Sequence, residues 1–158
     1  MLNREISRVL GACKKIRMPK IEDKDLRNQI IKDHLILLGK NKKYEQELEN
    51  LRTVHLGAYD KQIEKLQELQ NQLQTETDRA KQAEIVREIN AMTEVRDAIS
   101  TLNKAQDEIG KKEVKGITPI DAVKFTEELQ KQDYDCGIVE DIFPLLSYEI
   151  EEEKPKKK

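Results

Sequence analysis

The side chains that could do chemistry in this chain are few and widely spaced. There are two cysteines, Cys13 and Cys136, and two histidines, His34 and His55. The 21-residue separation of the histidines would put them about 30 Å apart on a straight helix. That is too far for the two rings to share a metal ion or a proton. Each histidine is therefore expected to be a polar or interface residue.

The two cysteines do not suggest a reactive pair. Cys13 falls among the apolar positions of the first expected helix, which predicts a buried, inert thiol. Cys136 lies between Asp135 and Gly137, and nearby negative charge discourages nucleophilic use of a thiol. Two distant cysteines, without a long apolar export segment at the N-terminus, indicate a reducing compartment rather than a disulfide scaffold.

The acidic stretch "DYDCGIVED" has four carboxylates between Asp133 and Asp141 and could suggest a calcium loop. An EF-hand loop requires glycine at its sixth position and glutamate at its twelfth. Counted from Asp133, Gly137 is at the fifth position and Pro144 at the twelfth. The spacing argues against a metal site, and an acidic turn beside an apolar segment is the simpler interpretation.

No catalytic motif was found along the chain. It has no HExxH and no CxxC, and "LGKNKK" lacks the second glycine of a phosphate-binding loop. The low hydrophobic content also predicts too little bulk to enclose a pocket. The sequence therefore predicts a protein that is not an enzyme and needs no cofactor or metal.

Charge is distributed unevenly along the chain. Residues 1–43 hold twelve Lys/Arg against five Asp/Glu, whereas residues 44–110 hold eight against fourteen. The basic segment could lie against acidic segments of the same or another copy. It could also bind nucleic acid, although it offers no aromatic residues for base stacking. The candidate phosphate contacts are Lys14, Lys15, Arg17, Lys20, Lys40, Lys42 and Lys43.

The composition favours long helices over a thick globular core. Hydrophobic residues make up 37% and charged residues 38% of the chain, against about 45–50% and 25% in average soluble domains. Helices that bury only a stripe fit such a composition. No run of about 18 apolar residues occurs, so no membrane span or membrane partner is expected. We expect a cytoplasmic protein with one helical domain over residues 1–150 and a charged tail over 151–158.

The spacing of apolar residues predicts a mainly α-helical fold built on a long, coiled-coil-like antiparallel hairpin. A short helix over 3–17 ends before Pro19. The hairpin arms are expected over 26–74 and 79–109, with Gly39 and Gly57 weakening the first arm. That arm is either one kinked helix or two helices stacked end to end. Its expected apolar positions begin with Ile30, Ile31, Leu35 and Leu38, and those of the second arm are Ile85, Ile89, Met92, Val95, Ile99, Leu102 and Ile109.

The C-terminal subregion, residues 117–150, should begin with a short helix capped by Thr118, with Pro119 at its first position, and ending near Gln132. The apolar stretch 138–150 follows, as a strand paired with an extended segment such as "KEVKGI" or as a short helix. Its apolar side is expected to dock on the helices of this chain or on another chain. The candidate interaction residues are Ile138, Val139, Ile142, Phe143, Leu145 and Leu146.

Two stretches resemble a family of small tailed-bacteriophage proteins of unknown function. "LNREISRVLGACKKIRMPKIEDKDLRNQIIKDHLILLGKNKKYEQELENLR" resembles its opening helix, proline-containing linker and long charged helix. "FTEELQKQDYDCGIVEDIFPLL" resembles its closing helix and extended apolar segment. The resemblance implies a virion component or an assembly accessory factor, in the host cytoplasm and the virion, and it implies no functional residues.

Together these observations predict a structural or protein–protein interaction protein. Its partner would be another protein or further copies of itself. The alternative is a nucleic-acid-binding accessory protein that uses the basic N-terminal segment.

Overall fold

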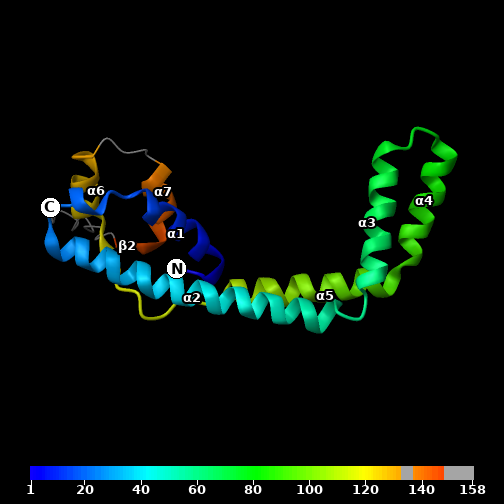
Figure 1. Ribbon diagram of the computed structural model, residues 1–158, viewed down its shortest axis with the longest axis horizontal. Helices are drawn as coiled ribbons and strands as arrows, with labels where there is room; N and C mark the ends of the chain where they lie inside the picture. Colours follow the sequence, from blue (N-terminus) through cyan, green and yellow to red (C-terminus); the bar gives the residue numbers. More distant parts are fainter. Residues whose placement is uncertain (133–136, 148–158) are drawn as a thin grey trace, which may run out of the picture. The chain divides into compact units, whose positions relative to one another are not determined.

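The computed structural model describes residues 1–132 and 137–147, and these are mainly α-helical, as predicted. Short 3-10 helices flank three of the α-helices, and two short strands pair near the C-terminal end (Figure 1). The elements are η1 (Asn3–Glu5), α1 (Ile6–Lys15), η2 (Met18–Lys20), α2 (Lys24–Leu56), α3 (Asp60–Thr75), α4 (Arg79–Ala91), α5 (Thr93–Gly110), β1 (Ile120–Asp121), α6 (Ala122–Gln130), α7 (Gly137–Ile142), η3 (Phe143–Leu145) and β2 (Leu146–Ser147).

The chain divides into two compact units, where the sequence predicts one domain. Unit 1 combines Met1–Lys43 with Lys111–Lys158, and unit 2 is Tyr44–Gly110. Because unit 1 joins both ends of the chain, its packing depends on contacts between residues that are far apart in sequence. Unit 2 is continuous in sequence.

Unit 1 contains a hydrophobic core made from both ends of the chain. Helix α1 packs along α7, and the first part of α2 contributes one buried face. The largest buried side chain is that of Phe125 in α6. The core residues are Ile6, Val9, Leu10, Ala12, Cys13, Ile16, Ile21, Leu26, Ile30, Leu37, Ile120, Phe125, Leu129, Ile138, Ile142 and Leu145.

The two short strands correct one prediction about the C-terminal stretch. Strand β2 pairs in parallel with β1, with Ile120 opposite Leu146, and not with "KEVKGI". That segment instead pairs with the N-terminus, where the Asn3 N–H donates to the Lys112 carbonyl at 2.9 Å and the Val114 N–H donates to the Met1 carbonyl at 3.0 Å. The predicted alternatives for the C-terminal stretch were a strand and a short helix, and both are present: α7 ends at Ile142, η3 follows, and β2 forms the two-residue strand.

The start of α6 also differs from the prediction. The helix begins at Ala122, and its N-cap is Asp121 rather than Thr118. The Asp121 carboxylate accepts hydrogen bonds from the backbone N–H groups of Val123 and Lys124, at 2.9 and 3.1 Å. An aspartate that satisfies two free helix donors is a stronger cap than a threonine. Pro119 therefore lies outside the helix.

Both predicted hairpin arms are interrupted in unit 2. The first breaks after Leu56, so α2 and α3 are separate helices, and the second breaks at Met92, between α4 and α5. A Cβ at Gly57 would lie 2.6 Å from the Thr53 carbonyl oxygen, so only glycine fits at the first break. An aspartate begins α4, since Asp78 accepts from the Ala80 N–H at 2.8 Å.

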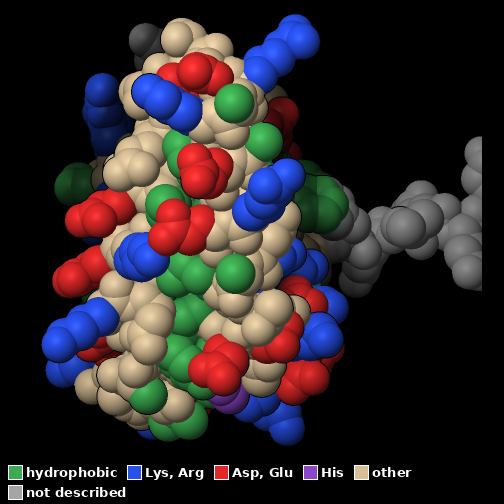
Figure 2. All heavy atoms as spheres, turned by 90° about the vertical axis from the view of Figure 1, so that its right-hand side faces the viewer, with side chains coloured by type: hydrophobic (Ala, Val, Ile, Leu, Met, Phe, Trp, Pro, Cys, Tyr) green, Lys and Arg blue, Asp and Glu red, His purple; other side chains and the backbone are tan. Residues whose placement is uncertain are grey.

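Within unit 2, α3 and α4 lie side by side (Figure 1) and are joined by residues 76–78. An ion pair between Lys65 and Glu88, with 2.6 Å between the two charged atoms, links them. The apolar stripe predicted for 85–109 is buried or half-buried throughout. Figure 2 shows one face of the molecule, on which cations and anions are interspersed around a narrow band of hydrophobic side chains. This is the surface expected of helices that bury only a stripe.

Candidate functional site

Helix α2 is apolar on two faces. Asp23 starts the helix, because its Oδ1 accepts hydrogen bonds from the Asp25 and Leu26 N–H groups, both at 3.0 Å, and these bonds lower the pKa of the Asp23 carboxyl. Spacings of four, three and four residues then place one set of side chains on the core face. This buried set is Leu26, Ile30, Asp33 and Leu37.

The second apolar face of α2 is exposed. Ile31, Leu35 and Leu38 are separated by four and three residues, so they form a line along the helix. Their exposed fractions are 41%, 65% and 44%. We call these three residues the outer face of α2. Single exposed leucines are normal on protein surfaces, but a continuous apolar line on a rigid helix is typical of a contact surface.

The surroundings of the outer face are cationic. Within unit 1, α2 carries Lys24, Arg27, Lys32, Lys40, Lys42 and Lys43. Lys24 lies seven residues before Ile31, and Lys42 lies seven residues after Leu35, so both continue the line of the outer face. Both lysines are exposed. A ligand of this face would therefore meet aliphatic side chains between two positive ends.

Sequence reasoning placed Ile31, Leu35 and Leu38 in the buried stripe of the hairpin, and that assignment is wrong. Leu26 and Ile30, from the same predicted pattern, are buried as expected, and Leu37, which the pattern left out, is buried beside them. The segment "IIKDHLILL" gave a signal, because its apolar residues surround more of the helix than one packing face needs. Such an excess indicates a second surface.

The predicted burial of Cys13 is confirmed. Its side chain lies in the unit 1 core, and burial, together with the nearby Asp33 carboxylate, raises the pKa of the thiol to about 11. A thiol that stays protonated at neutral pH is a poor nucleophile. Cys136 lies outside the described residues.

Asp33 is the least expected member of the core face. Its side chain is 1% exposed, and neither carboxylate oxygen has a hydrogen-bond partner of good geometry in the described part of the chain. Burial raises the pKa of Asp33, partly offset by the Thr118 backbone and by Lys32. A buried carboxylate without a full set of partners costs stability when it is ionised.

Glu128 is a buried carboxylate with partners. It accepts from the Glu22 backbone N–H at 2.6 Å and from the Lys131 ammonium at 2.7 Å. The bond from Lys131 is the larger cause of the lowered Glu128 pKa. Lys131 also donates to the Glu22 carboxylate at 2.9 Å, and these bonds raise the Lys131 pKa. The group ties α6 to the linker before α2, which is a structural role.

The predicted interaction residues of the C-terminal stretch lie mostly in the core of unit 1. Ile138, Ile142 and Leu145 are buried, and Val139 and Leu146 pack against the same core. Phe143 alone of the six is exposed. Tyr148 and Ile150, from the same apolar stretch, lie outside the described residues. The structure thus uses this stretch for packing within the chain.

The candidate phosphate contacts all lie in unit 1. They fall in α1, in and next to η2, and along α2, and they are exposed apart from the half-buried Lys40. None forms an ion pair with a described residue. They are spread over three elements and do not converge on one pocket.

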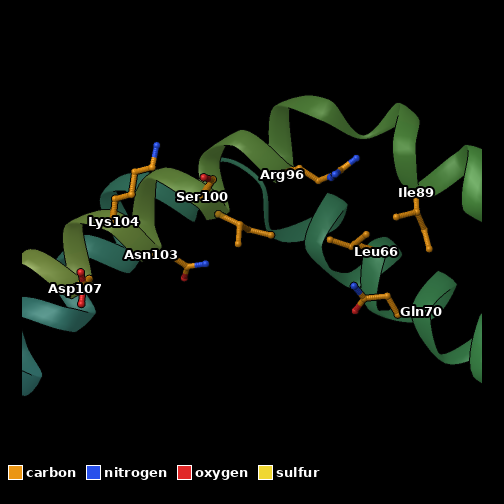
Figure 3. Close-up of a pocket in the computed structure, with 9 residues that line it drawn as sticks. Leu66, Gln70, Ile89, Arg96, Ser100, Asn103, Lys104 and Asp107 are labelled. Carbon is orange, nitrogen blue, oxygen red and sulfur yellow. The ribbon is translucent and has the colours of Figure 1, made fainter. Parts of the chain in front are cut away.

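Two open hollows among the described residues do not resemble active sites. In unit 2, an open depression of about 540 Å³ is lined by Leu66 and Gln70 of α3, Ile89 of α4 and residues of α5 (Figure 3). Its Arg96 guanidinium donates to the Asn90 side chain at 3.1 Å. In unit 1, a hollow of about 420 Å³ lies between the N-terminal residues and η3, next to Phe143. Neither contains a histidine or a cysteine.

The described residues were also compared with what a metal ion or a membrane would require. Among the described residues, no group of histidine, cysteine and acidic side chains is placed to bind a metal ion. The same part of the chain has no helix with both the length and the apolarity needed to cross a bilayer. Asp133 and Asp135, from the acidic stretch, lie outside the described residues.

In comparisons with protein-family models, curated proteins and solved structures, nothing matches the chain significantly. The resemblance to tailed-phage proteins therefore stays a prediction.

Proposed function

We propose that this protein is a non-enzymatic interaction protein in which unit 1 presents the outer face of α2 to a protein partner. The observation that carries the proposal is the exposed line of Ile31, Leu35 and Leu38 on a helix whose opposite side is fixed in a core. A rigid apolar helix face is one of the recurring recognition modes of proteins.

The energy available at this face suits a modest, reversible contact. Burying the exposed parts of the three side chains is worth about 2–4 kcal/mol gross. A single helix face is also smaller than the ~1,600 Å² of a standard stable interface. Other contacts of the partner must add to it, and the lysines at its ends are the nearest candidates.

The test is site-specific photo-crosslinking in native lysate. A photoreactive phenylalanine analogue replaces Leu35 in one variant and Val123 in the matched control. Both positions lie on unit 1 helices, and their exposed fractions are similar, at 65% and 67%. We expect a discrete protein adduct from position 35 and none from position 123. Equal labelling at both positions, or no adduct at position 35, would contradict the proposal.

We also propose that unit 2 works as a coiled-coil-like antiparallel hairpin, with breaks after Leu56 and at Met92. The half-buried stripes and the Lys65–Glu88 ion pair support it. Its role would be that of a spacer rather than a binding pocket. Cysteines at positions 65 and 88, in a background without Cys13 and Cys136, should be joined by a short bismaleimide crosslinker, which can span the length of the two paired side chains that they replace. Failure to form the crosslink would argue against the hairpin.

The setting that we propose is a tailed-phage particle or its assembly, as a virion component or accessory factor. The support is the resemblance of residues 2–52 and 125–146 to small phage proteins, together with the absence of a catalytic signature. Mass spectrometry of purified particles from a phage that encodes the chain would separate a virion component from an accessory factor.

Nucleic-acid binding is the alternative function, and the exposed cations of α1, η2 and α2 favour it. Titration with DNA and RNA at low and moderate salt tests it. Binding through phosphates weakens steeply with salt. The alternative is sustained only if such binding is seen and is lost when Lys14 and Lys15 are replaced by glutamine.

A further inference from the structure

We infer that the partner of the outer face of α2 is an acidic amphipathic helix of another protein. This inference rests on the proposed function, and it adds the chemical class of the partner. The face has three aliphatic side chains in a line, and the geometry that covers such a line is a second helix with its own apolar stripe.

The charges around the outer face determine what that second helix must carry. From residue 24 to residue 43, α2 has six cations and only two carboxylates, Asp25 and Asp33. Asp33 is buried on the core face. Asp25 is exposed, but it lies six residues before Ile31 and so about 120° around the helix. Lys24 and Lys42 therefore lie at the two ends of the outer face, and the first acid on the same line, Glu45, comes beyond Lys42, seven residues after Leu38. Glutamates or aspartates on the partner helix would complement the two lysines.

A second copy of this chain fits the same face poorly. In an antiparallel pair centred on Leu35, Lys24 comes next to Glu45, but Arg27 lies opposite Lys43, and Lys42 meets only the uncharged Asn28. In a parallel pair in register, each lysine lies beside its own counterpart. Like charges brought together at an interface oppose association. A second copy would thus complement Lys24 but not Lys42, whereas an acidic helix would complement both, so the charges favour a different, acidic protein over self-association.

Nucleic acid also matches this face less well than an acidic helix. Phosphates would satisfy the lysines, but they offer no counterpart to the apolar line between them. The outer face has no aromatic side chain on which a base could stack. A ligand that pairs with both the cations and the leucines must itself be apolar in the middle and acidic at its edges.

The experiment measures fluorescence anisotropy of two matched helical peptides with the full-length protein. Each has about 18 residues, long enough to sustain a helix. Both carry leucines at i, i+4 and i+7, and the flanking positions are glutamate in one and lysine in the other. We expect the glutamate peptide to bind at least about tenfold more tightly, with the difference shrinking as salt rises.

Two variants of the protein assign the binding to this face. Leu35→Ser should lower the affinity for the glutamate peptide about tenfold, as expected for a side chain at the centre of a small contact. Val123→Ser, at a similarly exposed position outside the outer face, should leave the affinity for the glutamate peptide unchanged. Because both side chains are exposed, both variants should fold, and circular dichroism checks this.

Several results would overturn the inference. The first is that the two peptides bind the wild-type protein with equal affinity. The second is that Leu35→Ser binds the glutamate peptide as tightly as the wild-type protein does. The third is that a DNA duplex binds the wild-type protein and that Leu35→Ser abolishes this binding. A dimer seen by sedimentation and lost in Leu35→Ser would also overturn it, because the face would then bind a second copy. If position 35 still crosslinks to a discrete protein in lysate, the proposed function survives while the acidic partner is rejected. If no adduct forms there, the proposed function fails as well.

Discussion

The two units of this protein bury their hydrophobic side chains in different ways. In the part of unit 1 that the structure describes, sixteen buried residues from both ends of the chain form one core. Unit 2 has fewer fully buried side chains in a longer continuous stretch, among them Leu66, Leu69, Val95 and Leu102. The first arrangement requires contacts between distant segments, and the second requires only helical periodicity. Stability and a defined surface should therefore be concentrated in unit 1.

The largest effect should follow removal of the C-terminal part of unit 1. Truncation after Gln132 deletes Ile138, Ile142 and Leu145, whose burial is worth about 5–9 kcal/mol gross. We expect the melting temperature to fall by more than about 10 °C, at about 2–4 °C per kcal/mol for a chain of this size. Thermal melting followed by circular dichroism measures it.

Light scattering on the same truncated protein provides the second readout. Exposure of the core face of α1 should promote aggregation. An unchanged melt together with loss of an oligomer would show that 138–147 forms an interface between copies, and it would contradict the core that unit 1 displays here.

The second prediction compares one substitution in the two units. Leu37→Ala removes a side chain from the core of unit 1, and Leu69→Ala removes one from the stripe of unit 2. Leucine-to-alanine changes cost about 2–5 kcal/mol, with the larger values where the surroundings cannot relax. Measured by urea denaturation, the loss of unfolding free energy should lie near the upper end of this range for Leu37→Ala and near its lower end for Leu69→Ala. Reversal of that order would contradict the difference between the units.

The third prediction concerns the two buried carboxylates of unit 1. Asp33 has a raised pKa, so its ionisation costs stability as the pH rises through and above its ordinary range. Asp33→Asn should therefore raise the melting temperature at pH 7 by a few °C, of the order of 1 kcal/mol. The gain should shrink as the pH falls through the ordinary aspartate pKa of about 3.9 and disappear by about pH 3, where the wild-type carboxyl is protonated in both states.

Glu128 should behave in the opposite way. Its pKa is lowered, so its stabilising effect is present at neutral pH and is lost as the pH falls through the lowered value. Glu128→Gln should lower the melting temperature at pH 7, and the melting temperatures of the variant and the wild-type protein should become equal in acid.

For Asp33, a fall in the melting temperature of Asp33→Asn at pH 7 would contradict the prediction. It would mean that Asp33 is stabilised by a hydrogen bond, with the Thr118 backbone as the candidate donor.

The smallest effects should come from two glycines of the first predicted arm. Gly39 is exposed within α2, and a Cβ there would meet nothing within 4 Å. Gly39→Ala should stabilise the protein by up to about 1 kcal/mol through helix propensity. Gly57→Ala should destabilise it, because the Cβ would lie 2.6 Å from the Thr53 carbonyl oxygen. Stabilisation by both changes would indicate that α2 and α3 can join into one helix.

These glycines also illustrate how much of the fold could be predicted from the sequence. The helices and their apolar spacing were predictable, because periodicity is a local property. The use of Gly57 as a break and Gly39 as a helical residue was not, since both depend on neighbouring backbone. Likewise, Asp121 rather than Thr118 caps α6 because of its two hydrogen bonds, and either residue type could have served.

The candidate site was harder to predict than the fold. Ile30 and Ile31 are adjacent and identical in type, yet one is in the core and the other is exposed. Which of them faces inward depends on where α1, α6 and α7 pack, and those contacts join distant parts of the chain. The excess of apolar residues in "IIKDHLILL" could reveal two faces, but it could not say which one is left open.

The measurement that tests the difference between the units most directly is native-state hydrogen exchange of the full-length protein, followed by mass spectrometry. Amides of α1, of α2 between Leu26 and Leu37, and of α6 should exchange only through global unfolding. Amides of α3 and α4 should exchange through openings of lower free energy. Equal protection of residues 60–91 and of unit 1, or earlier exchange in α1 than in α3, would contradict the account.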